Sequence, residues 1–226
     1  MSGRAPASFG RHELIARVRA ALGHRASRDP GPPPRIPDET VRVVATNSDL
    51  ASVFAANAAA VGMFVHRSSS ARATEVVCGI LKASNARRVA IAASPMLAGV
   101  REAMQRMNLE VVAHAGPGFE SLYDCDAGVT DAQAGIAETG SLVCAAGPGR
   151  GSGLSLVPPV HIAIVRKSDL VADLIDLWQR AGPADIALSR NIILITGPSK
   201  TADIEGVLIT GVHGPREVHI VLVEDS

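Results

Sequence analysis

A group of polar side chains follows an apolar run near the C-terminus of this chain. Ser199, Lys200 and Thr201 stand in a turn that begins with Gly-Pro, and Asp203 follows them. We expect a helix over 201–209, and the free N–H groups at its start would, with the lysine and the two hydroxyls, suit a carboxylate or a phosphate. The same residues are also typical of an ordinary capped helix start that binds no ligand.

A second turn brings a histidine and an arginine close together. A Gly-Pro pair separates His213 from Arg216, so both side chains project from one loop. Arginine offers two parallel donors to a carboxylate, and histidine exchanges protons near neutral pH. A 2-hydroxy acid ligand would need both the paired donors and the proton exchange. In the alternative interpretation, Arg216 pairs with Glu217 or Glu205 and only braces the turn.

The third polar group is the tripeptide Glu138-Thr139-Gly140, which precedes the apolar stretch 142–145. A carboxylate at the mouth of a strand can act as a general base or as a nucleophile, so Glu138 is a candidate catalytic group. Alternatively, Glu138 shapes the loop or pairs with a neighbouring cation.

Several familiar motifs are excluded by their spacing. The glycine-rich run 147–153 lacks the sixth-position glycine of a dinucleotide-binding loop and does not lead into a helix. We interpret it as a flexible flap with Arg150 at its tip. His161 begins an apolar strand, as a structural histidine or as a wall of a site. The histidines and cysteines show no H-x-x-x-H or C-x-x-C pair, so no metal site is expected.

Composition narrows the functional classes. Lys and Arg together number 22, as do Asp and Glu, and aromatic residues make up 3% of the chain. Nucleic-acid binding is therefore not expected, because it relies on excess positive charge and stacking side chains. No apolar run reaches the roughly 18 residues of a membrane span, and no apolar signal core appears near the N-terminus, so we expect a cytoplasmic protein.

The three cysteines, Cys78, Cys125 and Cys144, are scattered along the chain. This pattern predicts buried free thiols in a reducing compartment. It also excludes a self-contained iron–sulfur cluster, which takes four thiolates.

The chain divides into two parts. Residues 1–37 hold an apolar pattern at helical spacing from Leu14 to Leu22, followed by a proline-rich stretch that predicts a stiff, extended connector. The seven arginines in this part are also typical of an organellar transit peptide, although a docking helix explains the same pattern. Residues 38–226 form the second part, an α/β domain.

In that domain, continuous apolar runs alternate with helical patterns. This alternation predicts a three-layer α/β sandwich around a mostly parallel sheet that is covered on both faces. The topology of 115–153 stays open. We expect strands at 61–65, 89–92, 110–113, 142–145, 161–165, 192–195 and 218–223, and helices at 49–60, 71–83, 96–107 and 168–180.

Three long segments carry a family resemblance. The stretches GIAETGSL at 135–142, VPPVHIAIV at 157–165 and GPSKTADIEGVLITGVHGPREVHIVLV at 197–223 resemble, in this order, the lactate-utilisation protein C family, whose core is the LUD domain. The resemblance runs from about Val41 to the C-terminus. Two positions depart from the family pattern, with Ser141 in place of Thr and Lys200 in place of Arg.

The resemblance implies a fold similar to the sugar-phosphate isomerase and CoA-transferase group. It also implies a subunit of a cytoplasmic system that oxidises L-lactate to pyruvate, with iron–sulfur clusters only in partner proteins and no cofactor in this chain. It favours an anion site over the plain structural interpretation. The residues it implies are Glu138 and His213 for catalysis, and Thr139, Gly140, Ser199, Lys200, Thr201, Asp203, His213 and Arg216 for ligand binding.

Three functional hypotheses follow. The chain is an accessory subunit that binds a partner, an anionic ligand, or both. Alternatively, it is an enzyme on an anionic acyl, CoA or sugar-phosphate substrate, with Glu138 as base or nucleophile. In the third hypothesis it is a regulatory or scaffold protein with a vestigial pocket, docked through its N-terminal helix.

Overall fold

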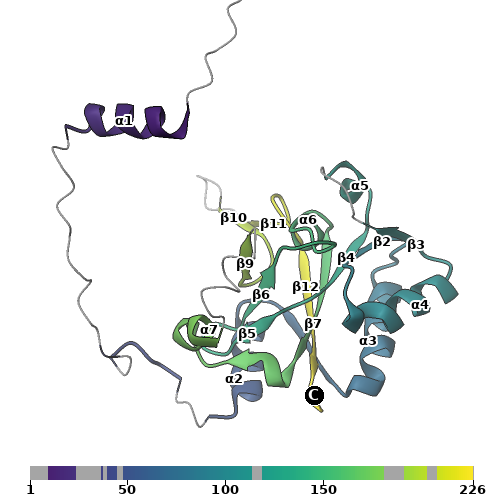
Figure 1. Ribbon diagram of the computed structural model, residues 1–226. Coiled ribbons are helices and arrows are strands. Elements are labelled where there is room, and N and C mark those ends of the chain that lie inside the picture. The colour runs from purple at the N-terminus through teal and green to yellow at the C-terminus, as the bar shows by residue number, and fades with distance from the viewer. Residues whose placement is uncertain are drawn as a thin grey trace, which may run out of the picture. The chain divides into compact units, whose positions relative to one another are not determined.

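The computed structural model describes residues 10–23, 37, 40–44, 48–113, 119–180, 191–202 and 208–225 (Figure 1). By its internal contacts the chain forms two units, Met1–Thr40 and Val41–Ser226. In the described residues, no helix is long and apolar enough to cross a membrane.

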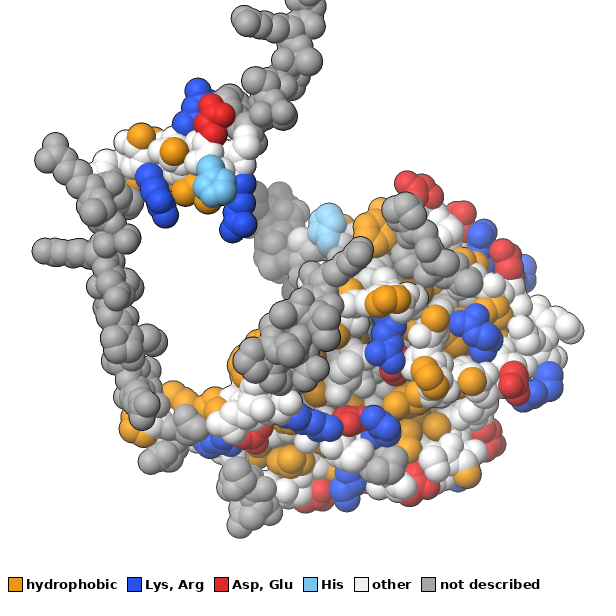
Figure 2. Space-filling model, in the orientation of Figure 1, with side chains coloured by type: hydrophobic (Ala, Val, Ile, Leu, Met, Phe, Trp, Pro, Cys, Tyr) orange, Lys and Arg blue, Asp and Glu red, His pale blue; other side chains and the backbone are white. Residues whose placement is uncertain are grey.

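In the part of the first unit that the structure describes, there is one α-helix, α1 (Arg11–Ala21), where the apolar spacing predicts it. Its apolar side chains are uncovered, with Leu14 56% and Val18 49% exposed, and they lie beside arginines in the space-filling view (Figure 2). Most of the proline-rich stretch lies outside the described residues, so the extended connector stays a prediction.

The second unit is built on a six-stranded sheet in which every neighbouring pair is parallel, as predicted. β7 is buried at its first six positions because both of its faces are covered, which explains its unbroken apolar run. In order across the sheet, the strands are β1 (Phe64–Ser68), β12 (Glu217–Val223), β7 (Val160–Arg166), β4 (Ala127–Asp131), β2 (Arg88–Ile91) and β3 (Glu110–Ala113).

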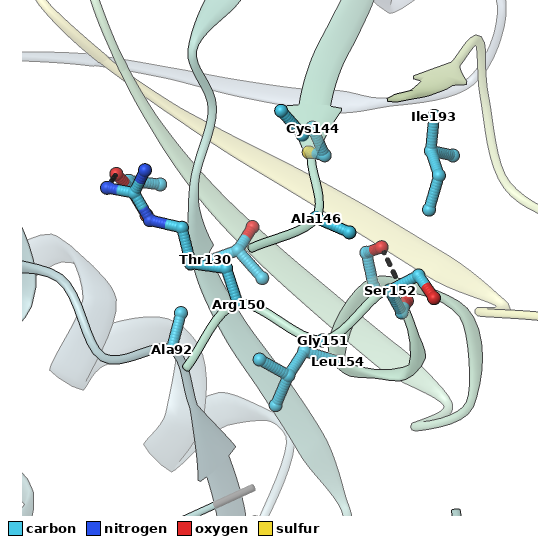
Figure 3. A pocket seen from close by; sticks show the side chains of 12 residues that line it. Ala92, Thr130, Cys144, Ala146, Arg150, Gly151, Ser152, Leu154 and Ile193 are labelled. Carbon is cyan, nitrogen blue, oxygen red and sulfur yellow. Dashed lines mark hydrogen bonds and ion pairs between the residues drawn. The ribbon is translucent and has the colours of Figure 1, made fainter. Parts of the chain in front are cut away.

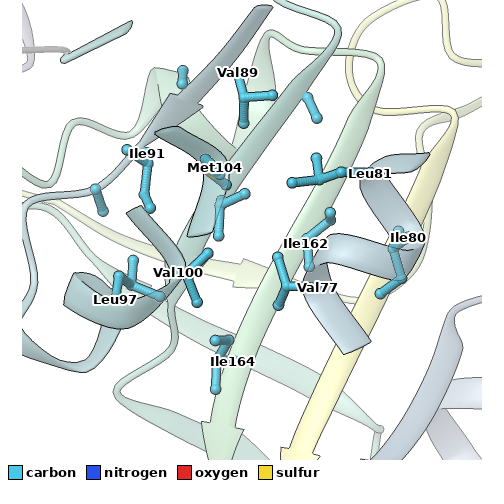
Figure 4. Close-up of a cluster of buried hydrophobic side chains, with 14 of the residues drawn as sticks. Val77, Ile80, Leu81, Val89, Ile91, Leu97, Val100, Met104, Ile162 and Ile164 are labelled. Atoms are coloured by element: carbon cyan, nitrogen blue, oxygen red, sulfur yellow. The ribbon is translucent and has the colours of Figure 1, made fainter. Parts of the chain in front are cut away.

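Two helices cover one face of this sheet. Helix α3 (Ser70–Ala83) and helix α4 (Ala98–Arg106), which follows the short 3-10 helix η2 (Pro95–Leu97), place apolar side chains against the central strands. Leu81 and Met104 are fully buried there beside Ile162 of β7 (Figure 4). Burial of this cluster is the main free-energy term that holds the two helices on the sheet.

Helix α2 (Leu50–Ala60) and a second sheet cover the other face. Phe54 of α2 and Leu142 pack there against Ala163 and Val165 of β7. The second sheet runs in the order β8 (Leu170–Val171), β5 (Ala134–Ile136), β6 (Ser141–Ala145) and β9 (Ile192–Ile195). The predicted three-layer α/β arrangement is therefore confirmed. The remaining short helices are α5 (Glu120–Tyr123), α6 (Gly153–Leu156), η3 (Lys167–Asp169) and α7 (Leu174–Arg180).

The helix predicted over 201–209 is wrong. β10 (Lys200–Ala202) pairs antiparallel with β11 (Leu208–Thr210), with Lys200 opposite Thr210. β-Branched residues in both segments favour extended backbone over helix. The free N–H groups of a helix start, on which the anion site partly depended, are therefore absent from 200–202.

Two further boundaries differ from the predictions. The helix predicted over 168–180 begins only at Leu174, because Leu170 and Val171 form β8 against β5. The strand predicted at 61–65 begins only at Phe64, because α2 extends to Ala60 and Val61 caps its end.

Candidate functional site

Two of the predicted loops lie against each other. The Ser199 N–H donates to the Pro215 carbonyl oxygen at 2.9 Å, and the Ser199 carbonyl oxygen accepts the Gly211 N–H at 2.9 Å. A Cβ atom on Gly214 would lie 3.2 Å from the Ser199 Cβ. Because β12 begins at Glu217, both loops lie at the amino edge of the parallel sheet.

Lys200 reaches the C-terminal end of α2. Its exposed ammonium group donates to the Val61 carbonyl oxygen at 3.3 Å, where the dipole of α2 favours a cation. Gly197, at φ +106°, approaches the same carbonyl so closely that a Cβ would lie 2.9 Å from it. The loop after β9 is therefore fixed to the end of α2.

The tripeptide at 138–140 packs on the preceding turn of α2. The Asn57 Nδ2 group donates to the carbonyl oxygens of Ala137 and Glu138, at 2.8 and 3.0 Å. Gly140 has φ +68°, and a Cβ there would overlap the backbone of Ala58. This geometry corresponds to the alternative interpretation, in which the backbone at Glu138 shapes the loop.

A chain of hydroxyls links the tripeptide to the loop after β9. Ser141 Oγ lies 2.6 Å from Thr139 Oγ1 and 2.6 Å from Thr196 Oγ1. Ser141, the departure from the family pattern, is buried and still supplies the hydroxyl that this chain needs. The loop at 138–140 and the loop after β9 therefore meet at the C-terminal half of α2, and the loop at 211–216 packs on the loop after β9.

The side chains of the predicted site residues are less tightly held than the backbone of the loops that carry them. The Glu138 carboxylate is half-buried, and among the described residues it forms no ion pair. His213 and Arg216 are exposed, and the Arg216 methylenes pack over Gly211. The alternative bracing pair with Glu217 is not seen; Glu217 instead lies 3.4 Å from His219 Nε2.

Thr201 lies in β10 opposite Ile209. Asp203 and Glu205 lie outside the described residues, so their predicted roles stay predictions.

A different polar cluster lies at the carboxyl edge, where sequence reasoning placed nothing. β2 leads to α4 on one face of the sheet, whereas β4 leads to β5 on the other (Figure 1). A crevice forms where such connections diverge, and open α/β sheets commonly bind ligands there. Asp131 ends β4 at this crevice and is 7% exposed.

Two side chains hold one oxygen of Asp131. Its Oδ2 atom accepts from Ser94 Oγ at 3.0 Å and from an Arg150 guanidinium nitrogen at 2.5 Å. The same guanidinium nitrogen also lies 3.2 Å from Ser94 Oγ. The Oδ1 atom is buried and has no hydrogen-bond partner among the residues that the structure describes.

The glycine-rich run 147–153 positions Arg150. The Ala93 N–H donates to the Gly149 carbonyl oxygen at 2.8 Å, and Gly149 adopts φ +69° with no room for a Cβ beside Ala93. Arg150 therefore extends inward to Asp131 rather than out from a flap tip. Figure 3 shows it on one side of a recess, with Cys144 and Ile193 on the other.

The recess has about 290 Å³ of free space, a figure that includes the open solvent at its mouth. Its walls leave room for about one water molecule. The lining is mixed, with apolar groups from Ala92, Leu154 and Ile193 and polar groups from Thr130 and Ser152.

Below the recess lie buried groups that stay uncharged. His161 is fully buried, and its Nε2 lies 2.9 Å from Thr130 Oγ1. Burial lowers the pKa of His161 to about 4 and raises the pKa of the Cys144 thiol to about 12. At neutral pH neither a charged imidazolium nor a thiolate forms, so His161 acts as a structural histidine beside the site.

Asp131, Ser94 and Arg150 were missed because they lie far apart in the sequence and match no motif. The available signals were weak: Ser94 precedes a helix start, and Arg150 stands in a glycine-rich run.

Comparison with known proteins gives the family. The LUD domain family model matches residues 51–223. Lactate utilization protein C of an Exiguobacterium species is 44% identical over 103 residues, which cover 44% of this chain and 45% of that protein. The namesake from Halalkalibacterium halodurans is 37% identical over 133 residues, covering 56% and 57%. The uncharacterized protein YkgG of Escherichia coli is 32% identical over 165 residues, covering 70% and 71%.

The chain spans about half the length of the first curated relatives it matches. A crystal structure of a DUF162 family protein from Deinococcus radiodurans shares the fold, with a TM-score of 0.61 and 22% identity over 80% of this chain and 99% of that one. Since the family model covers most of the sequence, the chain belongs to the LUD domain family.

Proposed function

We propose that this protein serves lactate utilisation as an accessory subunit that carries no iron–sulfur cluster of its own. The names of its relatives and its family membership support a role in lactate utilisation. The cysteine count supports the accessory role, because the sequence has three cysteines and a cluster takes four thiolates. Redox partners would then carry the electrons from L-lactate.

The observation that carries this proposal is the meeting of the loops at 138–140 and 197–200 at the end of α2, with the loop at 211–216 packed on the second of them. Two glycines at positive φ, Gly140 and Gly197, hold the loops close to the helix. Lys200, His213 and Arg216 are exposed on this same edge. A rigid backbone that presents cationic side chains is suited to an anionic ligand or to an acidic surface of a partner protein.

A growth assay tests the proposal. A strain that lacks this gene and any paralogue is complemented with the wild type, with a Lys200→Ala/Arg216→Ala variant, and with a control variant Arg72→Ala/Lys82→Ala on α3. The control removes the same two charge types from exposed positions. We expect the deletion to abolish growth on L-lactate, and the Lys200/Arg216 variant to restore less growth than the control at equal protein level.

The outcomes separate the hypotheses. Normal growth of the uncomplemented strain would refute the role in lactate utilisation. Full restoration by the Lys200/Arg216 variant would refute the cationic edge as the functional surface. In the same strain Glu138→Gln is expected to restore growth, because an accessory subunit needs no carboxylate nucleophile; loss of growth with a folded protein would favour the enzyme hypothesis.

A further inference from the structure

A second pocket lies over the carboxyl ends of β7 and β12, on the face of the sheet that α3 and α4 cover. Its walls are the first turns of α3, the segment from η2 to the start of α4, and the last residues of the two strands. We propose that this pocket binds a small carboxylate with a compact apolar body, such as a branched alkyl chain or a single ring, and that Arg166 holds the carboxylate. The pocket shares no lining residue with the recess beside Asp131 and contains none of the signature loops, so the proposal goes beyond the function proposed above.

The order of the strands explains why a pocket forms at this place. Helix α3 begins after β1 and α4 follows β2, and in the sheet β12, β7 and β4 lie between β1 and β2. β7 leads to η3 and β8, and β8 belongs to the second sheet on the other face. The space over the ends of β12 and β7 is therefore left open between the first turns of the two helices. The crevice outside the carboxyl ends of parallel strands is where open α/β sheets commonly bind ligands.

The size and lining of the pocket define the body of the ligand. The apolar lining residues are Ala73, Met96, Val100, Ile164 and Val223. Figure 4 shows Ile164 on β7, close to the arrowhead of that strand. The pocket has a volume of about 320 Å³ and is open to solvent, which places it at the lower end of the range for ligand sites. Because covering apolar walls is favourable, they select an apolar body, and the volume suits a compact one.

Arg166 supplies the charge that a carboxylate needs. It is the one charged side chain among the lining residues that the structure describes, and it is 49% exposed. Its Nε atom donates to Asp169 Oδ2 at 2.6 Å, whereas its two terminal amino groups form no hydrogen bond with the described residues. These two groups can donate in parallel to a carboxylate while the bond to Asp169 persists. Thr74, also in the lining, adds a hydroxyl donor.

Neighbouring carboxylates limit the charge of the ligand. Asp169 accepts from both Arg166 and Arg180. The Asp225 carboxylate accepts from the N–H of Ser70 at 2.6 Å and from its hydroxyl at 3.1 Å, at the start of α3. A phosphate monoester, which carries nearly two negative charges, would be repelled by these carboxylates. A carboxylate carries one charge, which the guanidinium of Arg166 can neutralise.

Three probes separate the contribution of the apolar body from that of the charge. Cyclohexanecarboxylate has both, cyclohexylmethanol has the body alone, and acetate has the charge alone. Each is titrated into the full-length protein, with binding followed by calorimetry and by NMR. We expect cyclohexanecarboxylate to bind saturably with a Kd of at most about 1 mM. The alcohol should bind at least about tenfold more weakly, because it lacks the charged hydrogen bonds, and acetate should show no saturable binding over the same range. The perturbed methyl resonances should include those of Ile164 and Val223.

Two substitutions locate the site. Ala73→Leu fills the pocket from α3 with a residue that suits a helix, and it should abolish binding of cyclohexanecarboxylate. Its control is Ala71→Leu, at an exposed position of the same helix. Arg166→Gln should weaken binding of the carboxylate at least about tenfold and leave binding of the alcohol unchanged. Its control is Arg106→Gln on α4, where the side chain is 70% exposed, and both controls should bind as the wild type does.

Several results would overturn the proposal. They are the absence of saturable binding of cyclohexanecarboxylate to the folded wild type, perturbed resonances only outside the pocket, and binding of the alcohol as tight as that of the carboxylate. Undiminished binding of cyclohexanecarboxylate by folded Ala73→Leu or by folded Arg166→Gln overturns it as well, and if one of these variants does not fold, the other decides. The growth assay on L-lactate changes other residues, so failure of either proposal leaves the other standing.

Discussion

The buried imidazole of His161 makes the stability of this protein depend on pH in a calculable way. The side chain is fully buried on β7 and shares a hydrogen bond with Thr130. Burial lowers its pKa from 6.5 to about 4, with a smaller contribution from His219. In the unfolded chain the same group titrates near its ordinary value.

The sign follows from proton linkage. Below pH 6.5 the unfolded chain takes up a proton that the folded protein refuses, so the free energy of unfolding falls as the pH drops from 6.5 toward 4. At 1.36 kcal/mol for each pKa unit, the whole shift corresponds to about 3 kcal/mol. Of this, about 2 kcal/mol is lost between pH 7 and pH 5.

The assay is urea unfolding of the wild type and of His161→Gln at pH 7 and at pH 5. Glutamine can keep a hydrogen bond to Thr130 and does not titrate. The variant should be less stable at pH 7 because its packing differs, but it should lose about 2 kcal/mol less than the wild type on acidification. His66 and His219, whose pKa values are also lowered by burial, are present in both proteins and cancel in the difference.

An exposed histidine provides the control, since His213→Gln should lose as much stability on acidification as the wild type does. If His161→Gln also loses as much as the wild type, the imidazole is not held neutral by burial and the reasoning fails.

Two further predictions concern backbone and thiol. Gly140→Ala should lower the free energy of unfolding by about 3 kcal/mol, because the added Cβ would overlap Ala58. The control Gly79→Ala, in open space on α3, should raise it by about 0.5–1 kcal/mol. Urea unfolding measures both, and a Gly140→Ala protein as stable as the wild type would contradict the structure. The thiol of Cys144, whose pKa is about 12 instead of 9.0, should be alkylated about a thousandfold more slowly in the folded protein than in the unfolded protein. Peptide mass spectrometry measures the two rates, and rapid labelling of Cys144 in the native state would contradict its burial.

The layers of this fold are visible in the sequence because burial leaves a local trace. Unbroken apolar runs such as 160–165 and 218–223 indicate strands covered on both faces, and the pattern over 70–83 indicates a helix with one buried side. Central strand β4 is harder to predict because it is short and contains Gly128, where a side chain would collide with the Leu154 carbonyl of α6. That requirement comes from a neighbour 26 residues away along the chain and leaves no periodic signal.

The candidate sites, like the layers of the fold, are visible in the sequence only in part. The signature segments can be picked out along the chain. The C-terminal half of α2 is a shared neighbour of two of them, which emerges only when Asn57 and Ala58 are seen to contact the loop at 138–140 and Val61 the loop at 197–200. β10 and β11 pair with each other where local composition predicted a helix, because a strand depends on a partner strand that local composition does not show. Asp131 and Arg150 are unremarkable in sequence and become a pair only because β4 and the run 147–153 end at the same crevice. Local patterns encode which residues are buried, whereas contacts between distant segments determine which polar groups meet, and those contacts arise from packing of the whole domain.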